Sequence, residues 1–142
     1  MPNYVNNRVI IRHKDSSKLA MLDEAYCNRN LFQTILPVPE GLLGTPNGVY
    51  ADPEKQAAME QRQAENRKLY GYSTDYSWRV ENWGVKWEAI GCDESLYKEG
   101  DDELVLEFQT PWGPPTGIYK ALREQGFNVD YDYWEEWEDH DA

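Results

Sequence analysis

The sequence predicts a single α+β domain with the element order βαββαβ, in which a four-stranded antiparallel sheet carries two helices on one face. Segments in which apolar and polar residues alternate recur four times along the chain, which is the pattern of half-buried strands. Helix-capping residues followed by apolar residues at helical spacing come after the first and the third of these segments. The length of 142 residues is that of one ordinary domain.

The N-terminal part of the chain predicts a strand, a helix and an extended segment. Residues 4–13 alternate between apolar and polar side chains and are predicted to form the first strand. Asp15 then provides a capping side chain, and apolar residues at helical spacing continue to Tyr26. Residues 31–39 contain two prolines, which remove backbone donors and predict either an edge position or an extended packing segment.

An insertion is predicted between residues 40 and 77. Asp52, Pro53 and Glu54 form a strong helix start, with an acidic N-cap, proline at the first helical position and an acid near the positive end of the dipole. This helix, at about 52–70, has no continuous apolar stripe. We therefore expect it to lie over the domain without entering the core.

The segment from Trp78 to Ile90 is predicted to be the centre of the core, because it holds three of the six tryptophans. From Val85 onward its residues alternate, which predicts the second strand. Gly84 permits a sharp bend just before that strand. A ligand-stacking site is the alternative interpretation of the tryptophan cluster.

The remaining elements follow from the C-terminal half. Residues 104–109 alternate and predict the third strand, and a helix is expected from about Pro115 to Gln125. Gly126 is the expected residue just past that helix, and residues 127–134 are predicted to be the last strand. With the insertion set aside, this order is βαββαβ, a plan whose open sheet face is a common binding surface.

Four segments also carry a family resemblance. They are residues 1–11, 32–40, 78–89 and 108–115. Together they resemble the YubB-like family of plasmid and phage proteins with a ferredoxin-like domain. The resemblance implies a ferredoxin-like fold and an origin in a bacterial mobile element, and it implies no catalytic or cofactor residues. The chain departs from the family pattern at Tyr4-Val5 and in its more acidic tail.

Acidic residues outnumber basic ones by 26 to 14, which gives a formal net charge of −12. Such a chain is expected to repel nucleic acids and anionic membranes and to be attracted to basic surfaces. Solubility alone is the competing explanation of the charge. The sequence has no apolar run long enough to span a membrane, and its two cysteines lie far apart. We therefore expect a cytoplasmic protein in a bacterial host cell.

The tail at 135–142, with the strand before it, concentrates this charge: seven carboxylates fall within twelve residues without a Lys or Arg. Carboxylates spaced along a strand imitate the phosphates of a nucleic acid, and interleaved aromatic side chains would anchor them in a partner's groove. The alternative is a solvated acidic end. The candidate partner-binding residues are Asp130, Asp132, Tyr133, Trp134, Glu135, Glu136, Trp137, Glu138 and Asp139, with Asp101, Asp102 and Glu103 from an acidic turn region.

No arrangement of reactive residues predicts an enzyme. His13 and His140 are not at metal-ligand spacing, and no phosphate-binding or nucleophile motif is present. Cys27 is predicted to lie on or near the buried side of the first helix, and Cys92 has no recognisable base beside it. The acidic clusters lack the ligand spacing of a calcium loop. We therefore expect no catalytic residue, metal or cofactor.

These observations favour a non-enzymatic mobile-element protein that binds and inhibits a host nucleic-acid-handling or defence complex, of the anti-restriction or anti-CRISPR type, by acidic mimicry. Its partner would be a basic host protein or nucleoprotein complex, without direct contact to nucleic acid or membrane. Two alternatives stay open. One is a nucleic-acid-binding module that uses aromatic side chains on the open sheet face. The other is an accessory protein that oligomerises, for example as a homodimer, through a Trp-rich surface.

Overall fold

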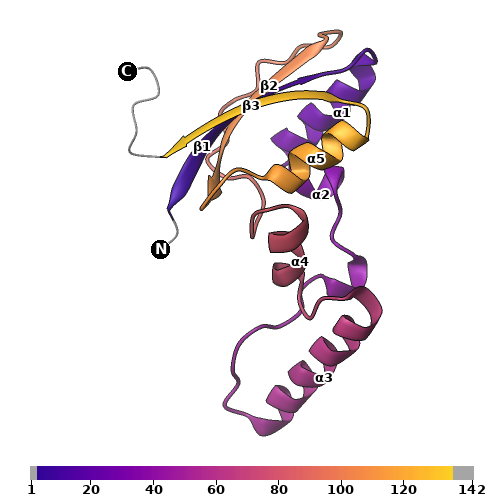
Figure 1. The fold of residues 1–142 in the computed structure, drawn as a ribbon, viewed down its shortest axis with the longest axis vertical. Coiled ribbons are helices and arrows are strands. Elements are labelled where there is room, and N and C mark those ends of the chain that lie inside the picture. The colour runs from indigo at the N-terminus through magenta and orange to yellow at the C-terminus, as the bar shows by residue number, and fades with distance from the viewer. Residues whose placement is uncertain (1–2, 136–142) are drawn as a thin grey trace.

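The computed structural model describes residues 3–135 and arranges them as a three-stranded antiparallel sheet with helices on one face (Figure 1). The strands are β1 (Tyr4–Arg12), β2 (Glu103–Pro111) and β3 (Asn128–Glu135), in the order β2-β1-β3. The helices are α1 (Ser16–Cys27), α2 (Leu31–Ile35), α3 (Pro53–Tyr70), α4 (Asp75–Asn82) and α5 (Thr116–Glu124), with a 3-10 turn η1 (Glu40–Leu42). The predicted α+β class is found, but the predicted four-stranded ferredoxin-like sheet is not.

The two faces of the sheet differ because side chains alternate along each strand. Val9 and Ile11 of β1 are each 1% exposed and lie opposite Leu106 and Leu104 of β2. The same core contains Leu19 and Leu22 of α1 and Ile118 and Leu122 of α5. The described helices that cover the sheet therefore lie on one side of it, and we call the other side the open face.

The strand predicted at Val85–Ile90, the second in chain order, does not form, so the sheet lacks its predicted fourth member. Only Ile90 makes a β-bridge, with Gln109 of β2, and the N–H of Asp93 donates to the carbonyl of Glu107 at 2.9 Å. Residues 90–93 thus occupy the outer edge of β2 as an irregular segment. The sheet has three strands in the described chain because this segment satisfies only part of that edge.

Other hydrogen bonds made by the tryptophan segment explain why it does not form a strand. Thr74 caps α4 by accepting a hydrogen bond from the N–H of Ser77, so Trp78 enters the core from a helix. Further along, the carboxylate of Glu88 accepts hydrogen bonds from the N–H groups of Phe32 and Gln33, at 2.6 and 3.2 Å, and so caps α2. Residues 85–89 are therefore a turn region, held at one end by α4 and at the other by the hydrogen bonds of Glu88 to α2, although apolar and polar residues alternate along them.

The prediction that these tryptophans belong to the core is met by Trp78 and Trp83, which are 8% and 3% exposed. Their rings pack edge to face with centroids 6.3 Å apart, and Trp83 packs in the same way on Phe32. Trp87 is only half-buried. The segment therefore stabilises the core through two of its three indoles.

The end of α4 lies directly against the start of α5. The N–H of Gly117 donates to the carbonyl of Trp83 at 3.0 Å, and a Cβ on Gly117 would lie 1.8 Å from the carbonyl oxygen of Asn82. Gly84 has a φ of +87°, as its predicted role in a bend requires. Glycines thus allow the two backbones to approach this closely.

Residues 31–39 were predicted to be extended, and this is wrong for their first half. Leu31–Ile35 is the helix α2, with Leu31, Phe32 and Ile35 buried against the core. The Glu88 carboxylate at its N-terminus supplies acceptors that this short helix cannot supply itself. That partner is distant in sequence, so the local pattern gives no sign of it.

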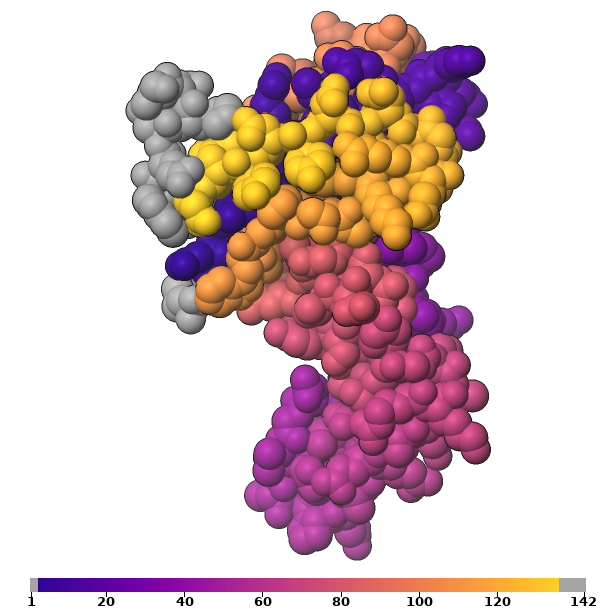
Figure 2. All heavy atoms as spheres, viewed as in Figure 1, coloured from indigo at the N-terminus to yellow at the C-terminus, as the bar shows by residue number. Residues whose placement is uncertain are grey.

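The insertion forms a helical arm, by which we mean residues 40–74 with η1 and α3. Helix α3 begins at Pro53 with Asp52 as its N-cap, and ends at Tyr70, where Gly71 with a φ of +82° is the C-cap. The arm extends away from the sheet and does not lie over it (Figures 1 and 2). Among α3 residues only Met59 and Asn66 are buried, which agrees with the lack of an apolar stripe.

Candidate partner-binding face

The open face of the sheet is formed by alternate residues of the three strands. The central strand contributes Arg8 and Arg12, with Asn6 nearer the other end. Its neighbours contribute carboxylates in register: Arg8 lies opposite Glu107 of β2 and Asp132 of β3, and Arg12 lies opposite Glu103 of β2. The charged residues of this face are therefore two arginines on the central strand, with acids on both neighbouring strands.

These arginines make ion pairs with the neighbouring acids. The Arg12 guanidinium contacts Glu103 at 2.9 Å and Asp130 at 3.2 Å, and Arg8 contacts Glu107 at 3.3 Å. Hydrogen bonds to Asp130 and then to Glu103 raise the pKa of Arg12. All these side chains are at least 42% exposed, so solvent screens the pairs. The ion pairs orient the acids without removing them from the surface.

Beside the arginines the open face is hollowed. A hollow of about 550 Å³ runs along the β2 side, and one of about 330 Å³ lies next to it near Trp134. They share Asp93 and Glu107. The carboxylate-bearing residues of the larger hollow are Asp93, Glu94, Asp101, Glu103 and Glu107, and Arg8 is the basic residue among them.

The segment after Ile90 is held in place by Tyr26 of α1. The Tyr26 hydroxyl lies 2.6 Å from the carbonyl oxygen of Asp93 and 2.8 Å from that of Glu107, so it donates a shared hydrogen bond to both. Burial, followed by its thiol and carboxylate neighbours, raises the pKa of Tyr26 well above its ordinary value. It therefore stays protonated and keeps Asp93 beside the hollow.

The structure brings some of the predicted partner-binding residues together. Asp130, Asp132 and Glu103 share the open face, and Trp134 lies next to Asn6 on the same side. Asp101 lines the hollow and accepts a hydrogen bond from the N–H of Lys98, while Asp102 is exposed at the start of β2. We call the open face with its hollow the acidic face; its acidic residues are Asp93, Glu94, Asp101, Glu103, Glu107, Asp130 and Asp132.

Other predicted residues lie elsewhere. Tyr133 is on the helix side of the sheet, opposite Asn7, and Glu135 is opposite Val5 on that same side. The remaining predicted acids and the last tryptophan, Glu136, Trp137, Glu138 and Asp139, lie outside the described residues. The acidic row proposed along β3 therefore consists, within the described chain, of Asp130 and Asp132.

Sequence reasoning missed Asp93, Glu94 and Glu107, and it missed both arginines. Arg8, Arg12 and Glu107 occupy the polar positions of segments that were correctly identified as strands. The alternation alone placed these residues on one face, so the signal was present. Asp93 gave no such signal, because its position depends on the hydroxyl of Tyr26.

The arginines change the mimicry hypothesis. Phosphate mimicry requires a row of uncompensated negative charges, whereas Asp130 shares Arg12 with Glu103. The face remains acidic in sum, since it has seven carboxylates against these two guanidiniums. It is better described as an acidic surface divided by a basic row than as an imitation of a nucleic-acid strand.

The structure also bears on the two alternative functions, a nucleic-acid-binding module and an oligomerising accessory protein. Tyr131 and Tyr133 lie on the helix side, so an open-face stacking platform would have Tyr4 and Trp134 as its described sheet aromatics. The Trp-rich surface proposed for oligomerisation is largely interior, because Trp78 and Trp83 are buried. Trp112 alone among the described tryptophans is strongly exposed, at 64%.

The two cysteines line one hollow of about 620 Å³, between α1 and the segment after Ala89. Cys27 is exposed, so its predicted burial is wrong, and Cys92 is exposed as well. Burial of their sulfur atoms is the first cause that raises the pKa of each thiol. Thiols with a raised pKa are poor nucleophiles at neutral pH. Within residues 3–135, no group of three metal-ligating side chains is found and no helix is long and apolar enough to cross a membrane.

Comparison with known proteins gives one limited relationship. A curated protein, the "Uncharacterized protein YubB" of Escherichia coli (strain K12), is 29% identical over 66 residues, which are 46% of this chain and 45% of that protein. No protein-family model and no solved structure matches the chain. The match spans about half of YubB, supports a YubB-like relationship over that part, and assigns no activity.

Proposed function

We propose that this chain is a non-enzymatic interaction protein that binds a basic surface of another protein through its acidic face. The observation that carries the proposal is the gathering of seven carboxylates on one side of the sheet, five of them around two adjoining hollows and two, Asp130 and Asp132, on the neighbouring strand β3. Fields of one sign focus over concave surfaces and speed the association of partners of opposite charge.

The arginine row gives such an interface specificity. A lysine or arginine of the partner is repelled above Arg8 and Arg12 and attracted on either side of them, over Glu107 or Asp132. Ion pairs within the face orient Glu107, Glu103 and Asp130 before binding. A partner with two parallel basic rows would therefore fit better than one with a single basic patch.

A specific form of this proposal follows from the sequence: the partner is a basic host protein that handles nucleic acid, and binding inhibits it. The proteins that bind nucleic acids carry basic surfaces of this kind. An acidic protein on such a surface competes with the nucleic acid. We propose this inhibitory role as the form to be tested first.

The test compares two double variants with the wild type in affinity capture from a bacterial lysate at low and high salt. Glu107→Gln with Asp132→Asn removes two charges from the acidic face. Glu60→Gln with Glu65→Gln removes two charges from exposed positions on α3, away from that face. Proteins held by the face should be retained by the wild type and the α3 variant, lost by the face variant, and released at high salt.

The affinity of a purified captured protein for the face variant should be about tenfold weaker, as expected for the loss of two screened contacts. Equal capture by all three forms would contradict the proposal. The inhibitory form is tested separately, by measuring whether the chain displaces DNA or RNA from the purified partner. Binding without displacement would remove the inhibitory form and leave the interface.

A further inference from the structure

The outer edge of β3 presents main-chain groups that no other described strand pairs. Strand β3 lies at the end of the order β2-β1-β3, so its one neighbour in the described sheet is β1. In an antiparallel pair, alternate residues point both main-chain groups toward the neighbour or away from it. The outward set in β3 contains Val129, Tyr131 and Tyr133.

Two local contacts identify this set. The carbonyl of Val129 accepts a hydrogen bond from the Arg123 guanidinium at 2.8 Å, and the N–H of Tyr133 donates to the Asp132 carboxylate at 2.8 Å. In β2, too, the odd-numbered residues point their main-chain groups away from β1, because Gln109 and Glu107 bond outward to Ile90 and Asp93. Part of the β2 edge is thus paired by the main chain of residues 90–93, whereas side chains satisfy part of the β3 edge.

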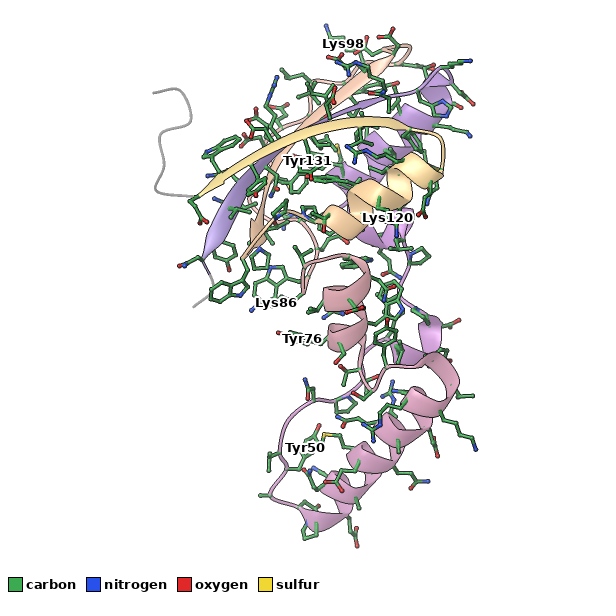
Figure 3. The ribbon with its side chains drawn as sticks, viewed as in Figure 1. Tyr50, Tyr76, Lys86, Lys98, Lys120 and Tyr131 are labelled. Carbon is green, nitrogen blue, oxygen red and sulfur yellow. The ribbon has the colours of Figure 1, made fainter. Side chains whose placement is uncertain are left out.

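The side chains along this edge alternate in chemistry. Asp130 and Asp132 lie on the open-face side, and the Asp130 side chain is 72% exposed. Tyr131 and Tyr133 lie on the helix side and are 38% and 50% exposed. Figure 3 shows Tyr131 beside α5. The buried ring of Tyr119 in α5 packs on Tyr131 with centroids 4.4 Å apart and holds it in place, so the exposed parts of Tyr131 and Tyr133 form the aromatic surface on this side.

The alternation of aspartates and tyrosines along β3 disfavours pairing of its outer edge with the same edge of a second copy of the chain. Two antiparallel β3 edges that continue one sheet keep their open faces on the same side, so aspartates of one copy would lie beside aspartates of the other. Like charges directly across from each other destabilise a strand pair. A strand with basic side chains on the open-face side has the opposite, favourable pairing.

We propose that the β3 edge receives an extended basic segment of a partner protein as an added strand. Its lysines or arginines lie beside Asp130 and Asp132, and its β-branched or apolar side chains lie beside Tyr131 and Tyr133. Strand addition at a sheet edge is an established mode of peptide recognition. The proposal rests on the proposed function, because it names the part of the basic partner that the acidic face would bind.

The two local contacts also define the limits of this site. Arg123 holds the Val129 carbonyl and repels an incoming cation, so the added strand pairs from Tyr131 toward Glu135. The N–H of Tyr133 must exchange the Asp132 oxygen for a carbonyl of the added strand.

The probe is a peptide of the length of β3 in which lysine and valine alternate, with a control peptide of the same composition whose lysines form one block. Binding is measured by calorimetry, and amide exchange is followed by NMR. We expect the alternating peptide to bind more tightly than the block peptide and to slow exchange at the Tyr131 and Tyr133 amides. Unchanged exchange at both amides with the peptide bound would overturn the strand addition.

A matched pair of variants isolates the main-chain contact. Tyr133→Pro removes the outward N–H, and Tyr133→Ala removes the ring but keeps that N–H. The proline variant should bind the peptide about tenfold more weakly than the alanine variant. Equal affinities would overturn the proposal, and amide exchange of the wild type decides the matter if the proline variant does not fold.

The outcomes separate this inference from the proposed function. If the Glu107→Gln, Asp132→Asn variant loses its captured partner while the proline variant retains it, the acidic face binds without strand addition. If neither change affects capture, the acidic face itself is not the interface.

Discussion

At the scale of single residues, Arg29 shows a backbone conformation that its side chain does not favour. It follows the end of α1 with a φ of +58°, where the N–H of Arg29 bonds to the carbonyl of Tyr26 and the N–H of Asn30 to that of Ala25. Such a helix ending usually carries glycine, because other residues lack room for their Cβ there.

Arg29→Gly should therefore stabilise the protein. We expect the free energy of unfolding to rise by about 0.5–1 kcal/mol, since relief of the left-handed conformation exceeds the added entropy of glycine in the unfolded chain. Arg29→Ala, which keeps a Cβ, serves as the control and should give no such gain. Urea denaturation of the three proteins measures the difference. A loss of stability in the glycine variant would contradict this account.

Glu88 makes stability depend on pH. Burial is the largest cause that raises its pKa, although hydrogen bonds from the N–H groups of Phe32, Gln33 and Ala89 oppose the rise. Because the folded protein then binds more protons at this group than the unfolded chain does, the contribution of Glu88 is greatest below its ordinary pKa of 4.5 and falls as the pH rises through its folded-state value.

Glu88→Gln removes this titration and keeps an acceptor oxygen for the N-terminus of α2. We expect the difference in unfolding free energy between Glu88→Gln and the wild type to change in favour of the variant as the pH rises from 4 to 7. Glu88→Ala should lose about 1–3 kcal/mol at all these pH values, because it leaves the N–H of Phe32 without its acceptor. Thermal unfolding across pH tests both, and a constant difference for the glutamine variant would refute the assignment.

At the scale of elements, the contact between α4 and α5 depends on the absence of one side chain. Gly117→Ala places a methyl group 1.8 Å from the carbonyl oxygen of Asn82, so the two helices must separate. We expect a loss of about 2–3 kcal/mol, as for other overpacked contacts. Gly113→Ala is the matched control, since its Cβ would meet no atom within 4 Å. Equal stability of the two variants would show that the contact is adaptable.

The sequence identified most strands and helices where local patterns decide them. The residues 4–13, 104–109 and 127–134 alternate and do form strands, and Asp52 and Asp15 do cap helices. Prediction failed at Val85–Ile90, where alternation is real but hydrogen bonds of Glu88 to α2 set the path of the chain. Local periodicity contains no information about such long-range bonds.

The candidate site was predictable to the same extent. Asp130, Asp132 and Glu103 were recognised from charge, and they do share a face. The opposing arginines could not be predicted from the acidic segment alone, because they lie on β1, more than a hundred residues earlier in the chain. Asp93 required knowledge of the irregular segment that Tyr26 holds.

At the scale of the whole molecule, the helical arm is attached through neighbouring points. The side-chain amide of Asn66 donates to the hydroxyl of Thr45 and to the carbonyl of Ser73, both at 3.1 Å, so the chain enters and leaves the arm within the reach of one side chain. The two ends of the arm therefore lie close together, and the arm is a long loop that leaves the sheet-containing part of the chain and returns to it at nearly the same place.

Replacing residues 47–71 by a short Gly/Ser linker should leave the remainder folded. We expect its unfolding to stay cooperative, with a free energy within about 2 kcal/mol of the wild type, because shortening a closed loop changes its entropy only slowly. The near-ultraviolet circular dichroism of the Trp78–Trp83 pair reports on the retained core. Loss of that signal would show that the arm is needed for the fold.

The two edges of the sheet have different consequences for assembly. Residues 90–93 pair with Gln109 and Glu107 at the rim of β2, whereas the rim of β3 has no strand beyond it in the described chain. The rim of β3 is therefore the longer uninterrupted edge at which another chain could pair. A partner strand seated there would cover this rim and keep a further copy of the chain from pairing with it.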